Sequence, residues 1–315
     1  MRSALLAVLL SLPSGAWADF GPGAKGTTAA GFLKLGAGAR AEGLGQAYAA
    51  AADEASALYW NPAALTRVER RSATFMHLAF VESSAFDYGA YAHNLGAARG
   101  AFGVGVQYAS AGGIPQTDEA GAETGRFTPN DLAFSLGYAR LLQTGGPLAV
   151  FDGASVGLSA KLVRSQIVAT AQTYAFDLGA LSKPYVDGRL RVAGVIRNLG
   201  GALRFEEESA ELPLEVRTGG SYRFSKPWLL ALDAAFPRDG GPYVAAGAEY
   251  RWAAGDAWAL IPRLGLNTRT LGDVDGFSGV SFGLGWAAGK LGFDYAFLPV
   301  GGVALTHRFS MTLAF

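Results

Sequence analysis

Residues 31–65 read GFLKLGAGARAEGLGQAYAAAADEASALYWNPAAL and differ from the rest of the chain. The stretch is too apolar, and too rich in glycine and alanine, to be a solvated tail. From Ser72 to Phe315 the chain consists instead of short segments in which large apolar residues alternate with small or polar ones. We therefore expect residues 31–65 to form a plug around which the strands of the later segment wrap.

The segments after Ser72 have the period of two that is typical of β-strands. Residues 102–108 (FGVGVQY) and 280–286 (VSFGLGW) show it clearly, because every second residue is large and apolar and the residues between them are small or polar. Such alternation fits either a soluble sandwich, which hides its apolar face, or a membrane barrel, which turns that face to lipid.

Three features favour the barrel. The face opposite the apolar residues is very rich in Gly, Ala and Ser, which suits a lumen crowded by a plug. Aromatic residues such as Tyr108, Tyr138, Trp252 and Trp286 stand at the ends of the apolar runs, as interfacial girdles require. The connections also alternate between long ones, such as residues 109–130, and short ones. We predict an all-β fold: a transmembrane outer-membrane β-barrel of about 14 antiparallel strands with an N-terminal lumenal hatch or plug.

Composition excludes several classes of function. The 315 residues carry 26 Lys and Arg and 26 Asp and Glu, so the net charge is zero. The sequence has no basic stripe of the kind that would indicate nucleic-acid binding. There is no cysteine, and the three histidines, His77, His93 and His307, are far apart in the sequence. No spacing typical of metal ligands is present. We expect no metal, no cofactor and no nucleic-acid partner.

Three short motifs match enzyme signatures only formally. Residues 36–41 fit G-x-G-x-x-A, but no strand–helix–strand unit follows them. Residues 153–157 and 279–283 fit G-x-S-x-G, but Ser155 and Ser281 lie inside alternating segments without the helix that a nucleophile elbow needs. The sequence therefore predicts that the protein is not an enzyme.

The N-terminus has the features of a secretory signal. Arg2 precedes an apolar core at residues 4–12, and Ala16-Trp17-Ala18 has the small-x-small form that signal peptidase reads. A short membrane anchor is the alternative, but the apolar run is about half of the roughly 20 residues that a bilayer requires. We expect three parts: a signal peptide (1–18), a hatch segment (19–71) and a barrel (72–315).

Residues 31–65, quoted above, also resemble the N-terminal signature of the PorV/PorQ family of outer-membrane proteins. That family is related to the FadL-type transporters of hydrophobic compounds, which carry a similar Asn-Pro-Ala element in a lumenal hatch. The resemblance implies a hatch turn packed inside the barrel, with a surface turn as the alternative. The residues that carry it are Gly36, Gly38, Arg40, Gly43, Gly45, Asp53, Ala55, Ser56, Tyr59, Trp60, Asn61, Pro62 and Ala63.

Charged residues within the alternating segments fall on the face opposite the apolar residues. On a lipid face each Arg or Lys near the midplane would cost roughly 2–4 kcal/mol, so we expect these side chains to face the lumen. They either pair with one another and hold the plug or line a polar conduit, and the balanced signs favour pairing. The residues are Lys161, Asp177, Glu215, Arg217, Asp233, Glu249, Arg251, Arg263, Asp294 and Arg308.

The resemblance returns at residues 291–297 and 306–315, and it implies the partners and the function. The C-terminal Phe315 resembles the signal by which the outer-membrane assembly machinery recognises its clients. The family resemblance implies location in the outer membrane, contact with its lipids, and an accessory role in type IX secretion that involves cargo proteins or secretion components. The alternatives are a FadL-like passive channel that binds a hydrophobic ligand and a purely structural protein.

Overall fold

The computed structural model describes residues 22–80, 84–145, 149, 151–206, 208–255, 257–271, 278–300 and 304–315, so the expected signal peptide lies outside the described residues. The helical elements are η1 (Pro22–Ala24), η2 (Gly31–Lys34), α1 (Ala39–Gly43), α2 (Ala57–Trp60), η3 (Pro62–Arg67) and η6 (Thr268–Thr270). The strands are β1 (Arg71–Ala79), β2 (Ala85–Asn94), β3 (Ala101–Ser110), β4 (Ile114–Thr117), β5 (Glu123–Phe127), β6 (Asn130–Leu141), β7 (Ser155–Gln166), β8 (Thr170–Leu181), β9 (Leu190–Gly200), β10 (Ala202–Phe205), β11 (Glu208–Glu211), β12 (Glu215–Tyr222), β13 (Trp228–Pro237), β14 (Tyr243–Tyr250), β15 (Trp252–Ala254), β16 (Trp258–Asn267), β17 (Val280–Ala288), β18 (Leu291–Val300) and β19 (Ala304–Ala314).

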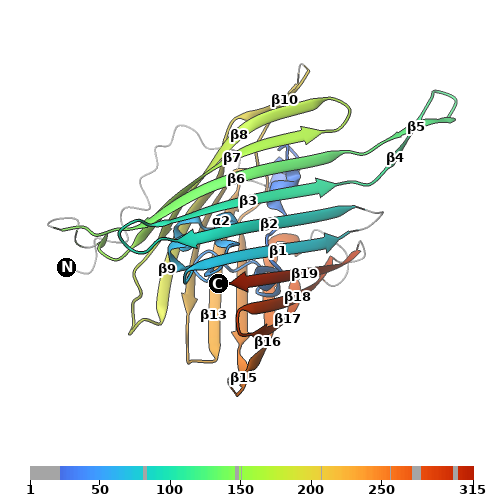
Figure 1. The fold of residues 1–315 in the computed structure, drawn as a ribbon. Coiled ribbons are helices and arrows are strands. Elements are labelled where there is room, and N and C mark those ends of the chain that lie inside the picture. The colour runs from blue at the N-terminus through green and yellow to red at the C-terminus, as the bar shows by residue number, and fades with distance from the viewer. Residues whose placement is uncertain are drawn as a thin grey trace.

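The long strands form one antiparallel sheet that closes on itself (Figure 1). The seam pairs β1 with β19, with Ser72 opposite Ala314 and Ala79 opposite His307. β14 and β15 both pair with β16 and are separated only by Arg251, so they are two parts of one strand of the barrel. Counted in this way the barrel has fourteen strands, which confirms the predicted fold class.

The outer face of the barrel is apolar. Along β6, the side chains of Phe134, Leu136 and Tyr138 are exposed, whereas Ala133 and the small residues that alternate with them face inward. A soluble sandwich would bury its large apolar residues, but here they form a belt around the outside, and such a belt is stable when it faces lipid. Within the described part of the chain, no helix is long and apolar enough to cross a membrane.

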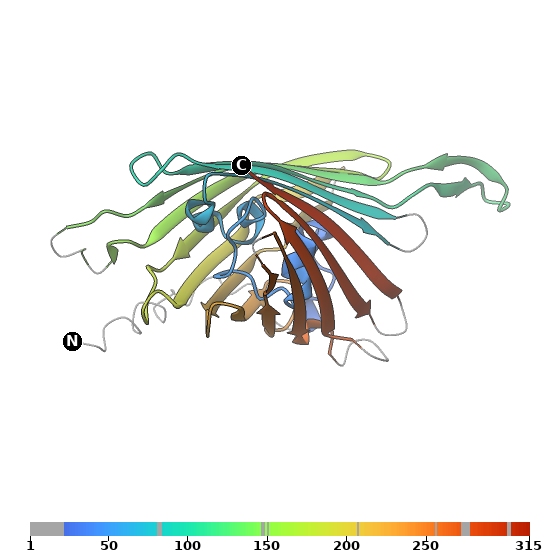
Figure 2. The same ribbon diagram turned by 60° about the horizontal axis from the view of Figure 1, so that its bottom comes forward.

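The two ends of the barrel differ. We call the end that holds the start of β1 and Phe315 the turn end, and the opposite end the loop end. The β4–β5 and β10–β11 hairpins extend from the loop end, and the β4–β5 hairpin projects far beyond the barrel (Figures 1 and 2). Short connections lie at the turn end, at residues 95–100, 223–227 and 289–290. Residues 142–154 make a longer connection at the same end.

Residues 31–68 run through the interior of the barrel, where Figure 2 shows them as the blue chain enclosed by the strands. η3 packs against β6, β7 and β8, while α1 packs against β16 to β19 on the other side of the interior. Most side chains of this internal segment are buried, including Leu44, Tyr48, Leu58, Trp60 and Leu65. The barrel core is therefore built from the internal segment and the inward residues of the strands together.

We expect Phe315→Ala to lower the yield of inserted protein while leaving the folded barrel almost unchanged. The backbone N–H of Phe315 donates to the carbonyl of Arg71 at 3.0 Å, and alanine keeps this bond. The contact of the ring with Tyr91, with centroids 6.2 Å apart, is lost. Membrane fractionation measures insertion, and circular dichroism of the purified barrel is the control. Unaltered insertion would show that Phe315 is only an end residue.

Candidate functional site: the internal segment and its contacts with the wall

Asn61 is fully buried and shapes the turn between α2 and η3. Its Oδ1 accepts a hydrogen bond from the Ala63 N–H at 3.0 Å, which caps η3, and Pro62 occupies the first position of that helix. This arrangement is favourable because proline at the start of a helix forfeits no hydrogen bond. The Asn61 Nδ2 donates to the carbonyls of Ala49 at 2.9 Å and Ala180 at 3.3 Å. One amide therefore joins the turn, an earlier part of the segment and the wall strand β8.

The wall is built to receive this turn. A Cβ atom on Gly179 would lie 2.1 Å from the Oδ1 of Asn61, and a Cβ atom on Gly157 would lie 2.4 Å from the backbone N of Ala63. Both distances are shorter than real Cβ contacts, so only glycine lets the turn lie against β7 and β8. The two glycines are therefore as much a part of the site as the Asn-Pro-Ala sequence.

Two aromatic side chains anchor α2. The Trp60 Nε1–H donates to the Ala37 carbonyl at 2.7 Å, and the Tyr59 hydroxyl donates to the Leu33 carbonyl at 3.1 Å. The guanidinium of Arg197, on β9, lies 4.7 Å from the centre of the Tyr59 ring, and that of Arg217, on β12, lies 5.5 Å from the Trp60 ring. Cations over aromatic faces are attracted by the ring quadrupole, and more strongly when water is excluded.

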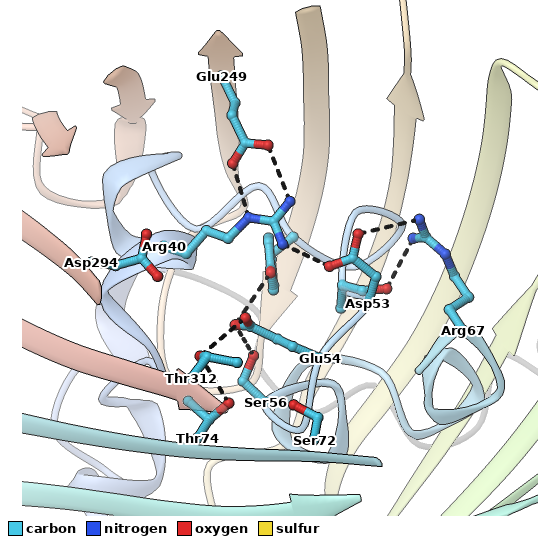
Figure 3. Close-up of polar contacts among 12 residues, drawn as sticks. Arg40, Asp53, Glu54, Ser56, Arg67, Ser72, Thr74, Glu249, Asp294 and Thr312 are labelled. Carbon is cyan, nitrogen blue, oxygen red and sulfur yellow. Dashed lines mark hydrogen bonds and ion pairs between the residues drawn. The ribbon is translucent and has the colours of Figure 1, made fainter. Parts of the chain in front are cut away.

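Arg40, on α1, is the centre of a charged network that crosses the interior (Figure 3). Its Nη1 donates to Asp53 at 2.6 Å, and its Nε donates to Glu249 of β14 at 2.9 Å. Glu249 also accepts from Arg263 of β16 at 2.7 Å, and Arg263 donates to Asp294 of β18 at 2.6 Å. The network joins two parts of the internal segment to three wall strands.

The carboxyls of Asp53 and Glu54 are adjacent in sequence but differ in charge environment. Burial raises the pKa of Asp53, but the positive charges of Arg40 and Arg67 outweigh this effect and hold the pKa below its usual range. Burial raises the pKa of Glu54, and Arg40 offsets only part of the effect. Glu54 accepts from the hydroxyls of Ser56 at 3.0 Å and Thr312 at 3.3 Å (Figure 3). The arginines therefore favour the charged form of Asp53, whereas Glu54 lies among hydroxyl groups.

A second network lies around Arg217. Its Nε donates to Glu215 at 2.9 Å and its Nη1 to Asp233 at 3.2 Å, and Arg197 donates to the same Glu215 at 2.6 Å. The backbone N–H groups of Tyr48 and Ala49 both donate to Asp233 at 3.0 Å. Here too the acids and bases of the wall pair with one another and also bind the internal segment.

The other residues expected to face the lumen follow the same rule, with one exception. Lys161 pairs with Asp177 at 2.8 Å, and Arg308 pairs with Glu42 of the internal segment at 2.5 Å. Arg251 is different, because it is exposed at the turn end, in the interruption between β14 and β15. The expectation of a lumenal Arg251 is therefore corrected: the alternation continues up to Tyr250, but the strand is interrupted at the next residue, and the side chain there is exposed.

The remaining signature glycines allow the internal segment to approach the wall. A Cβ atom on Gly43 would lie 2.9 Å from the Cα of Gly283, and one on Gly45, whose φ is +65°, would lie 2.6 Å from the Leu266 carbonyl. A Cβ atom on Gly36 would collide with the Glu42 carboxylate.

Other signature residues bind the wall strand β1. Ala55 and Ser56 are buried, and the Ala55 N–H donates to the hydroxyl of Ser72 at 3.2 Å. The Gly38 N–H donates to the sulfur of Met76 at 3.1 Å.

Several contacts were not anticipated from the sequence. Glu42, Arg67 and Arg197 take part in the networks, yet their sequence neighbourhoods gave no sign of their partners. In the sequence, Gly157 and Gly179 are only small residues that alternate with large apolar ones. The signal that could have found them is their alignment in register, since the two residues lie opposite each other on β7 and β8.

The motifs that formally match enzyme signatures, and the groups that could bind a metal, can be checked in the described part of the chain. There, no group of three or more His, Asp or Glu side chains could hold a metal ion. Ser155 and Ser281 lie within β7 and β17, and the Ser155 hydroxyl is hydrogen-bonded to Thr66 at 2.8 Å. The absence of an enzymatic activity stays a prediction.

Comparison with solved structures defines the class of protein. The Ralstonia pickettii toluene transporter TbuX superposes with a TM-score of 0.58 at 15% identity, over 89% of this chain and 98% of that one. The P. putida toluene transporter TodX gives 0.56 at 12%, over 89% and 99%. A Pseudomonas aeruginosa FadL homologue gives 0.53 at 10%, over 85% and 96%. At these identities the likeness concerns the fold, which is that of an outer-membrane β-barrel of the FadL type.

The sequence places the chain more narrowly. The family model described as type IX secretion system protein PorV matches residues 24–227, which include the internal segment and the first eight barrel strands up to the turn before β13. The chain therefore belongs to the PorV family, as its resemblance to PorV/PorQ proteins predicted. A comparison with curated protein sequences finds no match.

We expect Gly179→Ala to displace the Asn61 turn and to destabilise the protein by roughly 1–3 kcal/mol, the usual cost of overpacking. Gly194→Ala is the matched control, because it lies in the neighbouring strand β9 and a Cβ atom there would meet nothing within 4 Å. Urea-induced unfolding in detergent, followed by circular dichroism, measures the difference. Equal stability of the two variants would show that the turn does not depend on this close approach.

Proposed function

We propose that this protein is an accessory component of type IX secretion that handles cargo proteins at the outer membrane. The observation that carries the proposal is the match to the PorV family over residues 24–227, because it includes the internal segment as well as the strands. In this role the inner residues hold the structure together. The two ends of the barrel contact cargo or other secretion components.

We also propose that residues 31–65 act as a plug that does not leave the barrel in the resting state. Support comes from the number of wall strands that the segment binds through buried charges: Arg40 to β14, Glu42 to β19, and the backbone of Tyr48 to β13. Removing one partner of a buried ion pair leaves a charge without compensation, which typically costs 3–5 kcal/mol. Release of the segment would break several such pairs at once.

A passive channel for hydrophobic small molecules is the second candidate. A cavity of about 230 Å³ at the loop end is lined by Leu35, Phe80, Val280 and Leu298 together with polar groups, and a second cavity of about 210 Å³ shares Leu35 and Phe80. Mostly apolar cavities with a few polar groups are typical of small-molecule sites. The solved structures of similar fold include toluene transporters, which is the observation that favours this candidate.

Loss of the gene in its host tests the secretion role. Proteins that carry type IX C-terminal signals should accumulate in the periplasm, and the wild-type gene should restore their export. Fractionation with antibodies to one such cargo measures the effect, and an outer-membrane protein without that signal is the control. Normal export of every cargo examined would contradict the proposal and favour the channel.

Planar-bilayer recording tests the plug. We expect wild type to conduct ions poorly and the deletion of residues 31–65 to open a steady pore, because a barrel of fourteen strands without its internal segment encloses water. An open, porin-like conductance in wild type would contradict the proposal.

A fatty-acid binding assay separates the two candidate functions. Saturable binding of a fatty acid to wild type, lost in the variant Asn61→Ala/Pro62→Ala, would favour the hydrophobic-compound channel over the secretion role.

A further inference from the structure

The net charge of zero conceals a separation of charge between the two ends of the barrel. At the turn end, residues 69–71, 95–100, 140–154, 182–191, 223–227, 251–257 and 289–290 contain eleven Lys and Arg but only four Asp and Glu. The described residues of the connections at the loop end, within 80–84, 111–131, 164–170, 201–214, 238–242 and 268–279, contain five Lys and Arg and eight Asp and Glu. The turn end is therefore strongly basic, although the chain as a whole is neutral.

The basic side chains of the turn end are available to a partner. None of the eleven takes part in a salt bridge within the described residues, whereas Arg40, Arg217 and Arg263 of the interior are all paired. All eleven are exposed or half-buried, and Arg99, Arg140, Arg189, Lys226 and Lys290 are among the exposed ones. Unpaired cations at this density repel one another, so an anionic partner would stabilise the end that carries them.

Tryptophan marks the same end. Trp228, Trp252, Trp258 and Trp286 are the exposed tryptophans of the described chain, and all four lie near the turn end of their strands. They pack in pairs with other aromatic rings, such as Trp252 with Trp258 at 6.2 Å between centroids. Tryptophan side chains favour the boundary between hydrocarbon and headgroups. The cations therefore stand at or just beyond the level of the headgroups.

We propose that the turn end binds the phosphate groups of anionic phospholipids in the leaflet that surrounds it. Lysine and arginine close to an anionic membrane surface are attracted to it. The cations come from seven separate segments that follow one another around the barrel, as the order of the strands requires. A ring of this kind suits lipid headgroups, which surround the barrel on every side, better than it suits an acidic protein that contacts one face.

Spin-labelled lipids in vesicles that contain the full mature protein test this proposal. We expect labelled phosphatidylglycerol to be immobilised at the barrel surface more than labelled phosphatidylcholine. The preference should disappear near 1 M salt, where the screening length falls to about 3 Å. Replacing three turn-end cations, in the variant Arg140→Gln/Arg189→Gln/Lys290→Gln, should reduce the preference.

The matched control removes three exposed cations from the loop end, in the variant Arg126→Gln/Arg164→Gln/Arg204→Gln. It should leave the preference unchanged, and circular dichroism should show that both variants fold. Equal immobilisation of the two lipids by wild type would overturn the proposal and would assign the basic end to an acidic protein partner. An equal loss of preference in both variants would overturn it as well, because the effect would then follow net charge rather than location.

Discussion

The structure depends on one electrostatic constraint: every charge inside the barrel needs a partner of opposite sign. Water solvates charges at the rims but not beside Arg217 or Asp177, which are almost completely buried. The wall satisfies part of this requirement by pairing its own strands, as in the contact of Lys161 with Asp177. The internal segment satisfies much of the rest, because Glu42 is the partner of Arg308 and Arg40 adds a second cation to Glu249 beside Arg263. Wall and segment are therefore two halves of one electrostatic structure.

Steric fit complements these ion pairs. Charged side chains are long, and they hold the segment across the interior, whereas glycines such as Gly157 and Gly283 let its backbone lie directly against the strands. Close approach excludes water, and without water each ion pair and each cation–aromatic contact is stronger. The small residues on the inner faces and the few large ones on the segment are consequences of the same packing requirement.

The sequence predicts the barrel well, because the period of two is a property of each strand by itself. The expected number of about 14 antiparallel strands between Ser72 and Phe315 agrees with the fourteen observed there. The inward direction of Glu215 or Arg263 follows from the same alternation. Partners could not be predicted, since the pairing of Arg308 with Glu42 depends on where a segment without periodicity lies in three dimensions. Arg251 shows the limit of alternation, which carries no information once the strand is interrupted.

The closure of the ring also has a consequence for the order of folding. The seam between β1 and β19 joins the first and last strands of the barrel, so it closes the longest loop in the chain and incurs the largest entropic cost of closure. The internal segment is attached directly to β1 and contacts both early strands, such as β2, and the last strand, β19. Contacts between such distant parts of a sequence form slowly. The contacts of the segment with early strands such as β6 and with late strands such as β18 bring together the same distant parts of the chain as the seam does, so closure of the ring and enclosure of the segment share one entropic cost.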